Sequence, residues 1–219
     1  MNSPSAFDLA AFRSLPLVAI LRQQPSAAIP AIIQAITEGG FRAVEITMNS
    51  IDATDQIRTA IAHAPKKVVI GAGTVTTLVE LDEAEAAGAG FIVTPVVDPV
   101  VITECVSRGL PVFPGAFTPT EVHTAHQSGA TMVKLFPAHR LGPGYLNDLK
   151  APLSSVPLLA TGGITPENMP GYIQAGADGF GIGSPLLSTA RIVAQDWNWL
   201  RHRAAEFCAV WSTAFTDNR

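Results

Sequence analysis

One unit of sequence recurs along the chain and constrains its fold more than any other feature. In each copy a helical stretch ends in glycine, a short apolar strand follows, and a polar or Gly/Pro-containing turn comes next. The clearest copies read TEGGFRAVEIT, AAGAGFIVTP, SRGLPVFPG, QSGATMVKLFP and QAGADGFGIG. Glycine suits these helix ends because it adopts a left-handed backbone without penalty. Strands that alternate with helical stretches in this way predict parallel βαβ units.

The spacing of the copies predicts eight units. Gly88, Gly109 and Gly129 lie one unit apart, whereas the intervals Gly40 to Gly88 and Gly129 to Gly176 each leave room for one more, at VVIGAGT and VPLLATGG. With LVAIL added at the start, strands are expected near residues 17–21, 43–46, 68–72, 91–94, 111–114, 131–135, 157–160 and 179–182. Eight such units favour an α/β fold of the (β/α)8 TIM-barrel type, with an open doubly wound sheet as the alternative.

Length and composition are typical of one globular domain. The chain has 219 residues, of which 47% are apolar, and α/β barrels of this size commonly form single domains. No linker or low-complexity tract interrupts the pattern. We therefore expect a single TIM-barrel domain over residues 1–219, with the barrel core at about 15–190 and a C-terminal helical region at about 191–219.

Charge and cysteine content argue against several partners and compartments. There are 14 basic and 18 acidic residues, the net charge is -4, and no Lys/Arg cluster is present, so no nucleic acid is expected as a partner. No segment reaches the roughly 20 apolar residues that span a membrane, and MNSPSAFDLAAF does not read as a signal peptide. Cys105 and Cys208 lie far apart in helical stretches and suit reduced thiols. We expect a cytoplasmic protein.

Two charged residues stand inside apolar strands. Lys134 lies between Val133 and Leu135, and Glu45 lies within AVEIT. The outer face of a barrel strand lies beneath helices, so these side chains should point inward, near the mouth where barrel active sites lie. Burial and a neighbouring cation would lower the pKa of the lysine and provide neutral amine for attack on a carbonyl, while Glu45 moves protons. A structural ion pair is the alternative interpretation of Lys134.

Other polar or conformationally special residues follow the strands at the same end. Arg22 comes after the first expected strand, Thr74 after the third, and Thr94 and Pro95 close the fourth. The carboxyl ends of all strands in a parallel barrel surround one mouth. We therefore expect these residues to converge with Glu45 and Lys134 on a single cavity.

Glycine-rich turns follow the last two expected strands. They are TGGITPEN, residues 161–168, and GIGSP, residues 181–185, with Thr165 as the expected N-cap of the next helix and Pro166 as its first residue. Barrels frequently bind phosphate after strands seven and eight, where backbone N–H groups meet the anion. We expect phosphate to bind at four residues of these turns: Gly162, Gly163, Gly183 and Ser184.

The motifs at the ends of the expected strands, taken in their order along the chain, resemble those of the class I aldolases that cleave 2-keto-3-deoxy-6-phosphosugar acids. The resemblance runs from about residue 15 to 190 and includes AILR, VEITMNS, GAGTV, VTP, PGAFTPTE, VKLFPA, TGGITPEN and GIGS. It implies that Lys134 forms the Schiff base and that Glu45 is the general acid/base. It further implies that Arg22 and Thr74 hold the pyruvyl portion and that Phe136 lines the pocket, with core packing as the alternative role of Phe136.

The same resemblance bears on substrate, cofactor and assembly. Members that act on the gluconate substrate resemble EVTLRT around the glutamate, whereas EITMNS, with Asn49 in place of the arginine, looks more like the EIPLNS of 6-phosphogalactonate aldolases. This implies cleavage of the small phosphorylated keto acid 2-dehydro-3-deoxy-6-phosphogalactonate to pyruvate and D-glyceraldehyde 3-phosphate, with the gluconate epimer as the alternative. It also implies no cofactor and a homotrimer.

From the residues alone, two other functions stay open. A phosphosugar isomerase or epimerase would use the same phosphate site with Lys134 as an electrostatic group, and a non-catalytic protein would only bind a phosphometabolite. His123 and His126 lie in an expected helix without matching ligand partners, so no metal site is expected. A buried lysine and glutamate in one mouth favour an enzyme, because two desolvated charges are costly unless function retains them.

Overall fold

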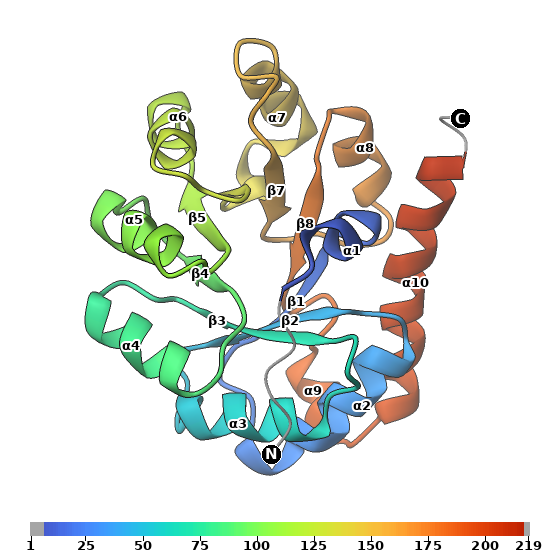
Figure 1. The fold of residues 1–219 in the computed structure, drawn as a ribbon. Coiled ribbons are helices and arrows are strands. Elements are labelled where there is room, and N and C mark those ends of the chain that lie inside the picture. The colour runs from blue at the N-terminus through green and yellow to red at the C-terminus, as the bar shows by residue number, and fades with distance from the viewer. Residues whose placement is uncertain (1–6, 217–219) are drawn as a thin grey trace.

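Eight parallel strands close into a barrel in the computed structural model, which describes residues 7–216 (Figure 1). They are paired in sequence order, and β8 closes the ring by pairing with β1. Every strand lies where the sequence predicts it, with small shifts at the ends, so the barrel is confirmed over an open sheet. The strands are β1 (Leu17–Leu21), β2 (Ala43–Thr47), β3 (Val69–Gly73), β4 (Ile92–Thr94), β5 (Val112–Ala116), β6 (Val133–Leu135), β7 (Leu158–Thr161) and β8 (Gly179–Ile182).

Helices alternate with the strands and form the outer layer (Figure 1). Gly88 and Gly129 follow helix ends with φ of 93° and 98°, the left-handed backbone that their positions predict. The α-helices are α1 (Leu9–Ser14), α2 (Ile29–Glu38), α3 (Ala53–His63), α4 (Leu78–Ala86), α5 (Pro99–Ser107), α6 (Pro119–Gln127), α7 (Gly142–Lys150), α8 (Met169–Gln174), α9 (Thr189–Val193) and α10 (Trp197–Thr216). Short 3-10 helices lie at η1 (Ser26–Ala28) and η2 (Ala138–Arg140).

Helix α8 begins later than the sequence predicts. The helix begins at Met169 with Asn168 as N-cap, so the prediction that Thr165 caps it and Pro166 opens it is wrong. The Thr165 N–H donates to Asn168 Oδ1 at 2.9 Å, and the Asn168 N–H reaches Thr165 Oγ1 at 3.4 Å. Asparagine and threonine side chains compete in this way with helical backbone bonds, so residues 165–168 form a turn before the helix.

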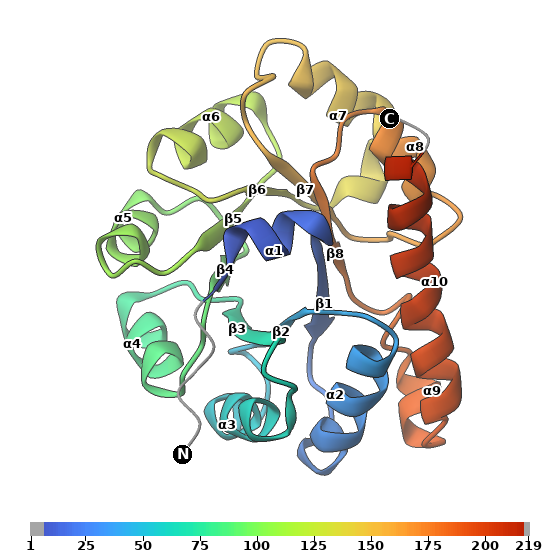
Figure 2. The ribbon, with the colours of Figure 1, turned by 45° about the vertical axis from the view of Figure 1, so that its right-hand side comes forward.

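The barrel interior has an aromatic floor at its amino end. Helix α1 precedes β1 and lies across that end (Figure 2), where the ring of Phe12 is 5.6 Å from that of Phe113. The rings of Phe91 and Phe113 are also 5.6 Å apart. The floor leaves the carboxyl end of the barrel as the open side. Its buried members are Phe12, Val18, Ile20, Ala43, Phe91, Val93, Phe113, Met132 and Leu159.

The C-terminal helix α10 belongs to the outer layer and packs along α2 and α8 (Figure 1). Trp211 is buried there, with its ring 6.1 Å from that of Phe180 in β8. Among the helices of residues 7–216, none combines the length and the apolar character needed to cross a membrane.

Both cysteines are free thiols, as the sequence predicts. Cys105 is buried in α5, and Cys208 is half-buried in α10. Burial raises the pKa of each thiol to about 11, which disfavours the reactive thiolate. Both therefore act as packing residues.

Candidate active site

The two charged strand residues face the barrel interior. In β2, Val44 and Ile46 join the core beneath the helices and Ala43 joins the interior floor, so the alternation of a strand directs Glu45 inward. Lys134 alternates in the same way between Val133 and Leu135 in β6. Glu45 is 1% exposed and Lys134 is 5% exposed.

A glycine stands on the neighbouring strand beside each of these two side chains. Gly115 of β5 is the register partner of Lys134, and Gly73 ends β3 beside the Glu45 carboxylate. A side chain at Gly73 would occupy the volume that the carboxylate fills. Two polar groups thus stand within a packed barrel interior.

Burial dominates the ionisation of both groups. It raises the pKa of Glu45, and the nearby charges of Lys134 and Arg22 oppose that rise. It lowers the pKa of Lys134, which Arg22 lowers further and Glu45 raises. Burial therefore shifts Lys134 toward its neutral amine, the form that attacks a carbonyl, and shifts Glu45 toward its neutral carboxyl form, which can donate a proton.

The alternative of a structural ion pair for Lys134 finds no support in the contacts. Within residues 7–216, neither Lys134 nor Glu45 takes part in a salt bridge, and Glu45 Oε1 is buried without a hydrogen-bond partner. A stabilising buried ion pair needs close contact and satisfied hydrogen bonds. These two groups are near enough to shift one another's pKa but are not locked together.

Phe136 lies at the mouth rather than in the core. Its side chain is 39% exposed, and Lys134 Nζ lies 5.3 Å from the ring centroid. On its other side the ring approaches the turn after β7, because a Cβ on Gly162 would be 3.4 Å from Phe136 Cδ2. Phe136 therefore lines the space between Lys134 and that turn.

The remaining residues expected at the mouth follow their strands directly. Arg22 is exposed after β1, and Thr74 is half-buried after β3 with a φ of 58°. Thr94 Oγ1 donates to Val96 O at 2.5 Å and holds the turn that contains Pro95. Gly115 is in register with Lys134, and a Cβ on Gly115 would meet the Pro95 carbonyl oxygen at 2.6 Å, so the backbone of Pro95 packs against β5 on the side that Lys134 faces.

The turns after β7 and β8 offer free backbone donors. The strands that precede them are neighbours, with Thr161 in register with Gly181. The carbonyl oxygens of Gly162 and Gly163 accept hydrogen bonds from His139 N–H and Asn168 Nδ2. In the part of the chain that the structure describes, no protein acceptor is bound by the N–H groups of Gly162, Gly163, Gly183 and Ser184. Unpaired N–H groups of this kind are suited to bind an anion.

Two features of the mouth were missed by the sequence interpretation. Thr161, the last residue of β7, is 3% exposed, and its Oγ1 has no hydrogen-bond partner within residues 7–216. Thr161 immediately precedes the two glycines of the TGG motif, and this position could have identified it as a residue of the mouth. At the rim, Tyr145 donates its hydroxyl hydrogen to Phe117 O at 2.6 Å, a contact between two neighbouring units that no local pattern predicts.

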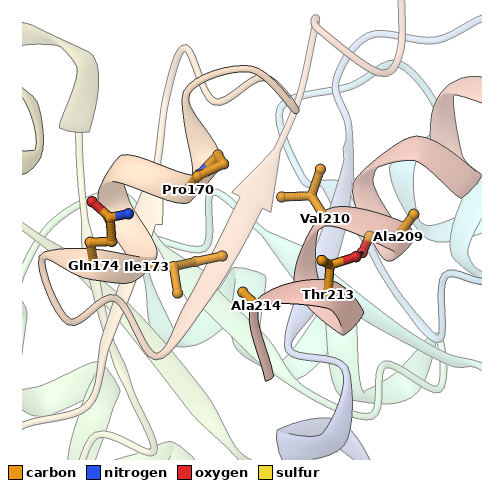
Figure 3. Close-up of a pocket in the computed structure, with 7 residues that line it drawn as sticks. All are labelled: Pro170, Ile173, Gln174, Ala209, Val210, Thr213 and Ala214. Carbon is orange, nitrogen blue, oxygen red and sulfur yellow. Dashed lines mark hydrogen bonds between the residues drawn. The ribbon is translucent and has the colours of Figure 1, made fainter. Parts of the chain in front are cut away.

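A second hollow lies in the outer layer, away from this mouth. It has a volume of about 730 Å³ between α8 and α10 (Figure 3). Its lining within residues 7–216 has no titratable side chain, and so the described residues offer no group for acid–base chemistry there. The lining residues are Pro170, Ile173, Gln174, Ala209, Val210, Thr213 and Ala214. The described residues also contain no group of three or more His, Cys, Asp or Glu placed to hold a metal ion.

A closed parallel barrel with a buried lysine and a buried glutamate at its carboxyl end defines a barrel enzyme with carbonyl chemistry. The chain belongs to the KDPG and KHG aldolase family, whose model matches residues 9–202. It is therefore an aldolase, a carbon–carbon lyase, and the resemblance seen in the motifs is confirmed.

Relatives and solved structures agree with this membership. A 2-dehydro-3-deoxy-6-phosphogalactonate aldolase of Escherichia coli (strain K12) is 40% identical over 180 residues, covering 82% of this chain and 88% of the relative. A probable 2-dehydro-3-deoxy-6-phosphogalactonate aldolase of Rhizobium meliloti (strain 1021) is 38% identical over 172 residues, covering 78% and 81%. A structure described as native KDPGal superposes with a TM-score of 0.86 at 37% identity, covering 92% of this chain and 97% of that one.

Proposed function

We propose that the protein cleaves 2-dehydro-3-deoxy-6-phosphogalactonate to pyruvate and D-glyceraldehyde 3-phosphate through a Schiff base on Lys134. The observation that carries the proposal is the lysine itself, buried at the mouth of the barrel with Glu45 nearby and with its pKa lowered by burial. A neutral amine at neutral pH is the form that attacks a carbonyl.

The reaction proceeds in balanced steps at these two side chains. Neutral Lys134 Nζ attacks the C2 carbonyl, and the resulting carbinolamine takes up one proton and loses water to give an iminium; the final hydrolysis releases that proton again. The C3–C4 bond then breaks, its electron pair moves toward the iminium nitrogen to form an enamine, and Glu45, through water, takes the proton of the C4 hydroxyl as the aldehyde leaves. Glu45 returns a proton to C3 of the enamine, and hydrolysis of the iminium releases pyruvate and regenerates Lys134.

Recognition is divided between the two ends of the substrate. Arg22 and Thr74 hold the pyruvyl portion, and the unpaired N–H groups of the turns after β7 and β8 bind the phosphate. Phe136 and Pro95 shape the pocket near Lys134. Support for the galactonate epimer comes from Asn49, which is exposed beyond β2, and from the named substrate of the two relatives above. The gluconate epimer is the second candidate substrate.

Two measurements test this function. Incubation with pyruvate and borohydride should leave a reduced adduct on Lys134, which peptide mass spectrometry locates, and Lys134→Ala should abolish both adduct and turnover. Activity that survives Lys134→Ala would overturn the mechanism and favour an isomerase or epimerase without a covalent intermediate. Pyruvate release from the two epimeric substrates, measured side by side, decides between galactonate and gluconate.

The proposal extends to a cytoplasmic homotrimer. Support comes from apolar side chains exposed beyond three neighbouring strands: Ile51 after β2 is 80% exposed, Val79 after β3 is 66% exposed, and Val100 after β4 is 61% exposed. Exposed apolar residues gathered at one end of a fold are typical of interfaces. Light scattering should give a molecular mass three times that of one chain, and Val79→Asp should lower the measured mass. A wild-type protein with the mass of a single chain would contradict the trimer. Cell fractionation tests the location.

A further inference from the structure

A buried pair of hydroxyl groups lies under the turn that follows β2. Thr47 is 0% exposed and Ser50 is 8% exposed, and their side-chain oxygens are 3.0 Å apart. The Ser50 N–H donates to Thr47 O at 2.9 Å and closes the turn that carries Asn49. Ser50 Oγ accepts a hydrogen bond of 2.9 Å from the N–H of Gln23, which belongs to the turn after β1. The hydroxyl pair thus joins two neighbouring turns of the mouth.

The hydrogen bond from Gln23 to Ser50 holds the backbone next to Arg22. Gln23 has a φ of 51°, a left-handed conformation that is unfavourable for a residue other than glycine unless its surroundings hold it. The side chain of Gln24 donates to Arg22 O at 3.0 Å. The peptide group between Arg22 and Gln23 is therefore held through its N–H by Ser50 and through its carbonyl by Gln24.

A second link joins the same two turns. Gln56 of α3 is 2% exposed, and its Nε2 lies 3.1 Å from Gln24 O and 2.9 Å from Ile51 O. It also lies 3.0 Å from Ser26 Oγ. One buried amide thus connects the turn after β1 with the turn after β2, independently of Ser50.

We propose that Ser50 is a positioning residue that sets the place of Arg22 through the Gln23 N–H, with Gln56 as a second link. The Arg22 side chain is exposed and forms no ion pair within residues 7–216, so its own contacts do not fix it. The backbone that carries it is held instead. The inference rests on the proposed function, in which Arg22 holds the pyruvyl portion beside Lys134.

Loss of the hydroxyl has a specific consequence. The Gln23 N–H is left without a partner, which disfavours the present turn and lets the guanidinium move. Arg22 lowers the pKa of Lys134, so a displaced Arg22 lets that pKa rise. In Ser50→Ala the pH dependence of borohydride trapping with pyruvate should move to higher pH, and KM should rise more than kcat falls, with kcat/KM lower by roughly tenfold.

The experiment compares Ser50→Ala, Ser50→Thr, Arg22→Ala and the double variant Ser50→Ala/Arg22→Ala. Threonine keeps the hydroxyl and should restore the wild-type pH profile, and Ser50→Ala should add nothing to Arg22→Ala if it acts through that residue. Ser107→Ala is the matched control, because within residues 7–216 the exposed Ser107 hydroxyl donates to the Glu104 carbonyl of its own helix and to no residue of the mouth. Gln56→Leu repeats the test at the second link and also removes an unpartnered buried oxygen, Gln56 Oε1.

The outcomes separate this inference from the proposed function. A wild-type protein that cannot be trapped at Lys134 would overturn the proposed function itself. Wild-type trapping at Lys134, together with an unchanged pH profile and KM in both Ser50→Ala and Gln56→Leu, would overturn the positioning role alone. Additive losses in Ser50→Ala/Arg22→Ala would also overturn it, because Ser50 would then act by a route other than Arg22.

Discussion

At the mouth of the barrel, the Glu45 carboxylate occupies the space that a side chain at position 73 would fill, which the glycine there leaves open. A Cβ built on Gly73 would lie 1.7 Å from Glu45 Oε1 and 2.5 Å from Glu45 Cγ. Gly73 does not have a left-handed backbone, so the requirement at this position is for space and not for conformation. The glycine that ends β3 therefore decides where the carboxylate on β2 stands.

Gly73→Ala should displace the Glu45 side chain and lower activity in a folded protein. The methyl group would overlap the carboxylate and force another rotamer, and misplacement of a general acid/base by about 1 Å can cost roughly a hundredfold in rate. We expect kcat/KM to fall by at least tenfold. Gly144→Ala is the control, since a Cβ there meets nothing within 4 Å. Wild-type activity in a folded Gly73→Ala would show that Glu45 has no fixed catalytic place.

Glu45→Gln should raise stability while it removes activity. Burial raises the folded-state pKa of Glu45, so its contribution is fully present below the unfolded pKa and is lost as pH rises through the folded value. At pH values above the unfolded pKa, keeping this carboxyl group in its buried site therefore lowers stability. The amide removes this cost, and we expect a gain of about 1 kcal/mol, or roughly 2–4 °C in Tm for a chain of this size.

The pH dependence of that gain is the sharper test. The difference in Tm between Glu45→Gln and wild type should be largest at neutral pH and above, and it should shrink toward the ordinary carboxyl pKa. Glu83→Gln, on the exposed face of α4, should leave Tm unchanged at every pH. A Glu45→Gln protein less stable than wild type at neutral pH would mean that the carboxylate stabilises the fold.

Trapping of pyruvate at Lys134 should titrate below the ordinary lysine pKa of about 10.4. Burial lowers the pKa of Lys134, Arg22 lowers it further, and Glu45 raises it. The midpoint of the trapping rate against pH should therefore fall in Glu45→Gln and rise in Arg22→Ala. Shifts in the same direction in both variants would contradict the opposite effects of the two charges on the lysine.

The sequence predicts the barrel and its two buried charges because both signals are local. The recurring helix–glycine–strand unit determines the strand count, and a lysine or glutamate between apolar neighbours has no favourable place on the helix-covered face. The start of α8 was predicted wrongly because Asn168 accepts a hydrogen bond from the backbone of Thr165 and holds a turn. The local sequence pattern does not reveal which of two possible capping residues, Thr165 or Asn168, precedes the helix.

The residues that position the chemical groups could not be predicted from the sequence, because their roles depend on contacts between different βα units. Gly73 reads as an ordinary small strand residue, and its role is visible only when β2 lies beside β3. Ser50 belongs to the motif EITMNS, but its partner is the backbone of Gln23 in the preceding unit. The candidate chemical groups were therefore predictable, whereas the residues that position them depend on register and turn geometry.

Phosphate recognition is best tested at Gly183. At Gly162, φ is 98° and a Cβ would approach Phe136 and Pro137 at 3.4 Å, so a substitution there strains the turn whatever it does to an anion. Gly183 has no left-handed backbone and nothing within 4 Å of its Cβ position. Gly183→Val should therefore leave the fold intact and obstruct the N–H groups of the turn.

Gly183→Val should raise KM for the phosphorylated substrate by about tenfold or more, because one or two charge-assisted hydrogen bonds of roughly 1.5–3 kcal/mol each are lost. Borohydride trapping of pyruvate, which has no phosphate, should persist at the wild-type rate, since Lys134 lies on another strand. Comparing kcat/KM for phosphorylated and unphosphorylated substrates makes the test specific. A folded Gly183→Val protein that keeps the wild-type preference for the phosphorylated substrate would place the phosphate away from the turn after β8.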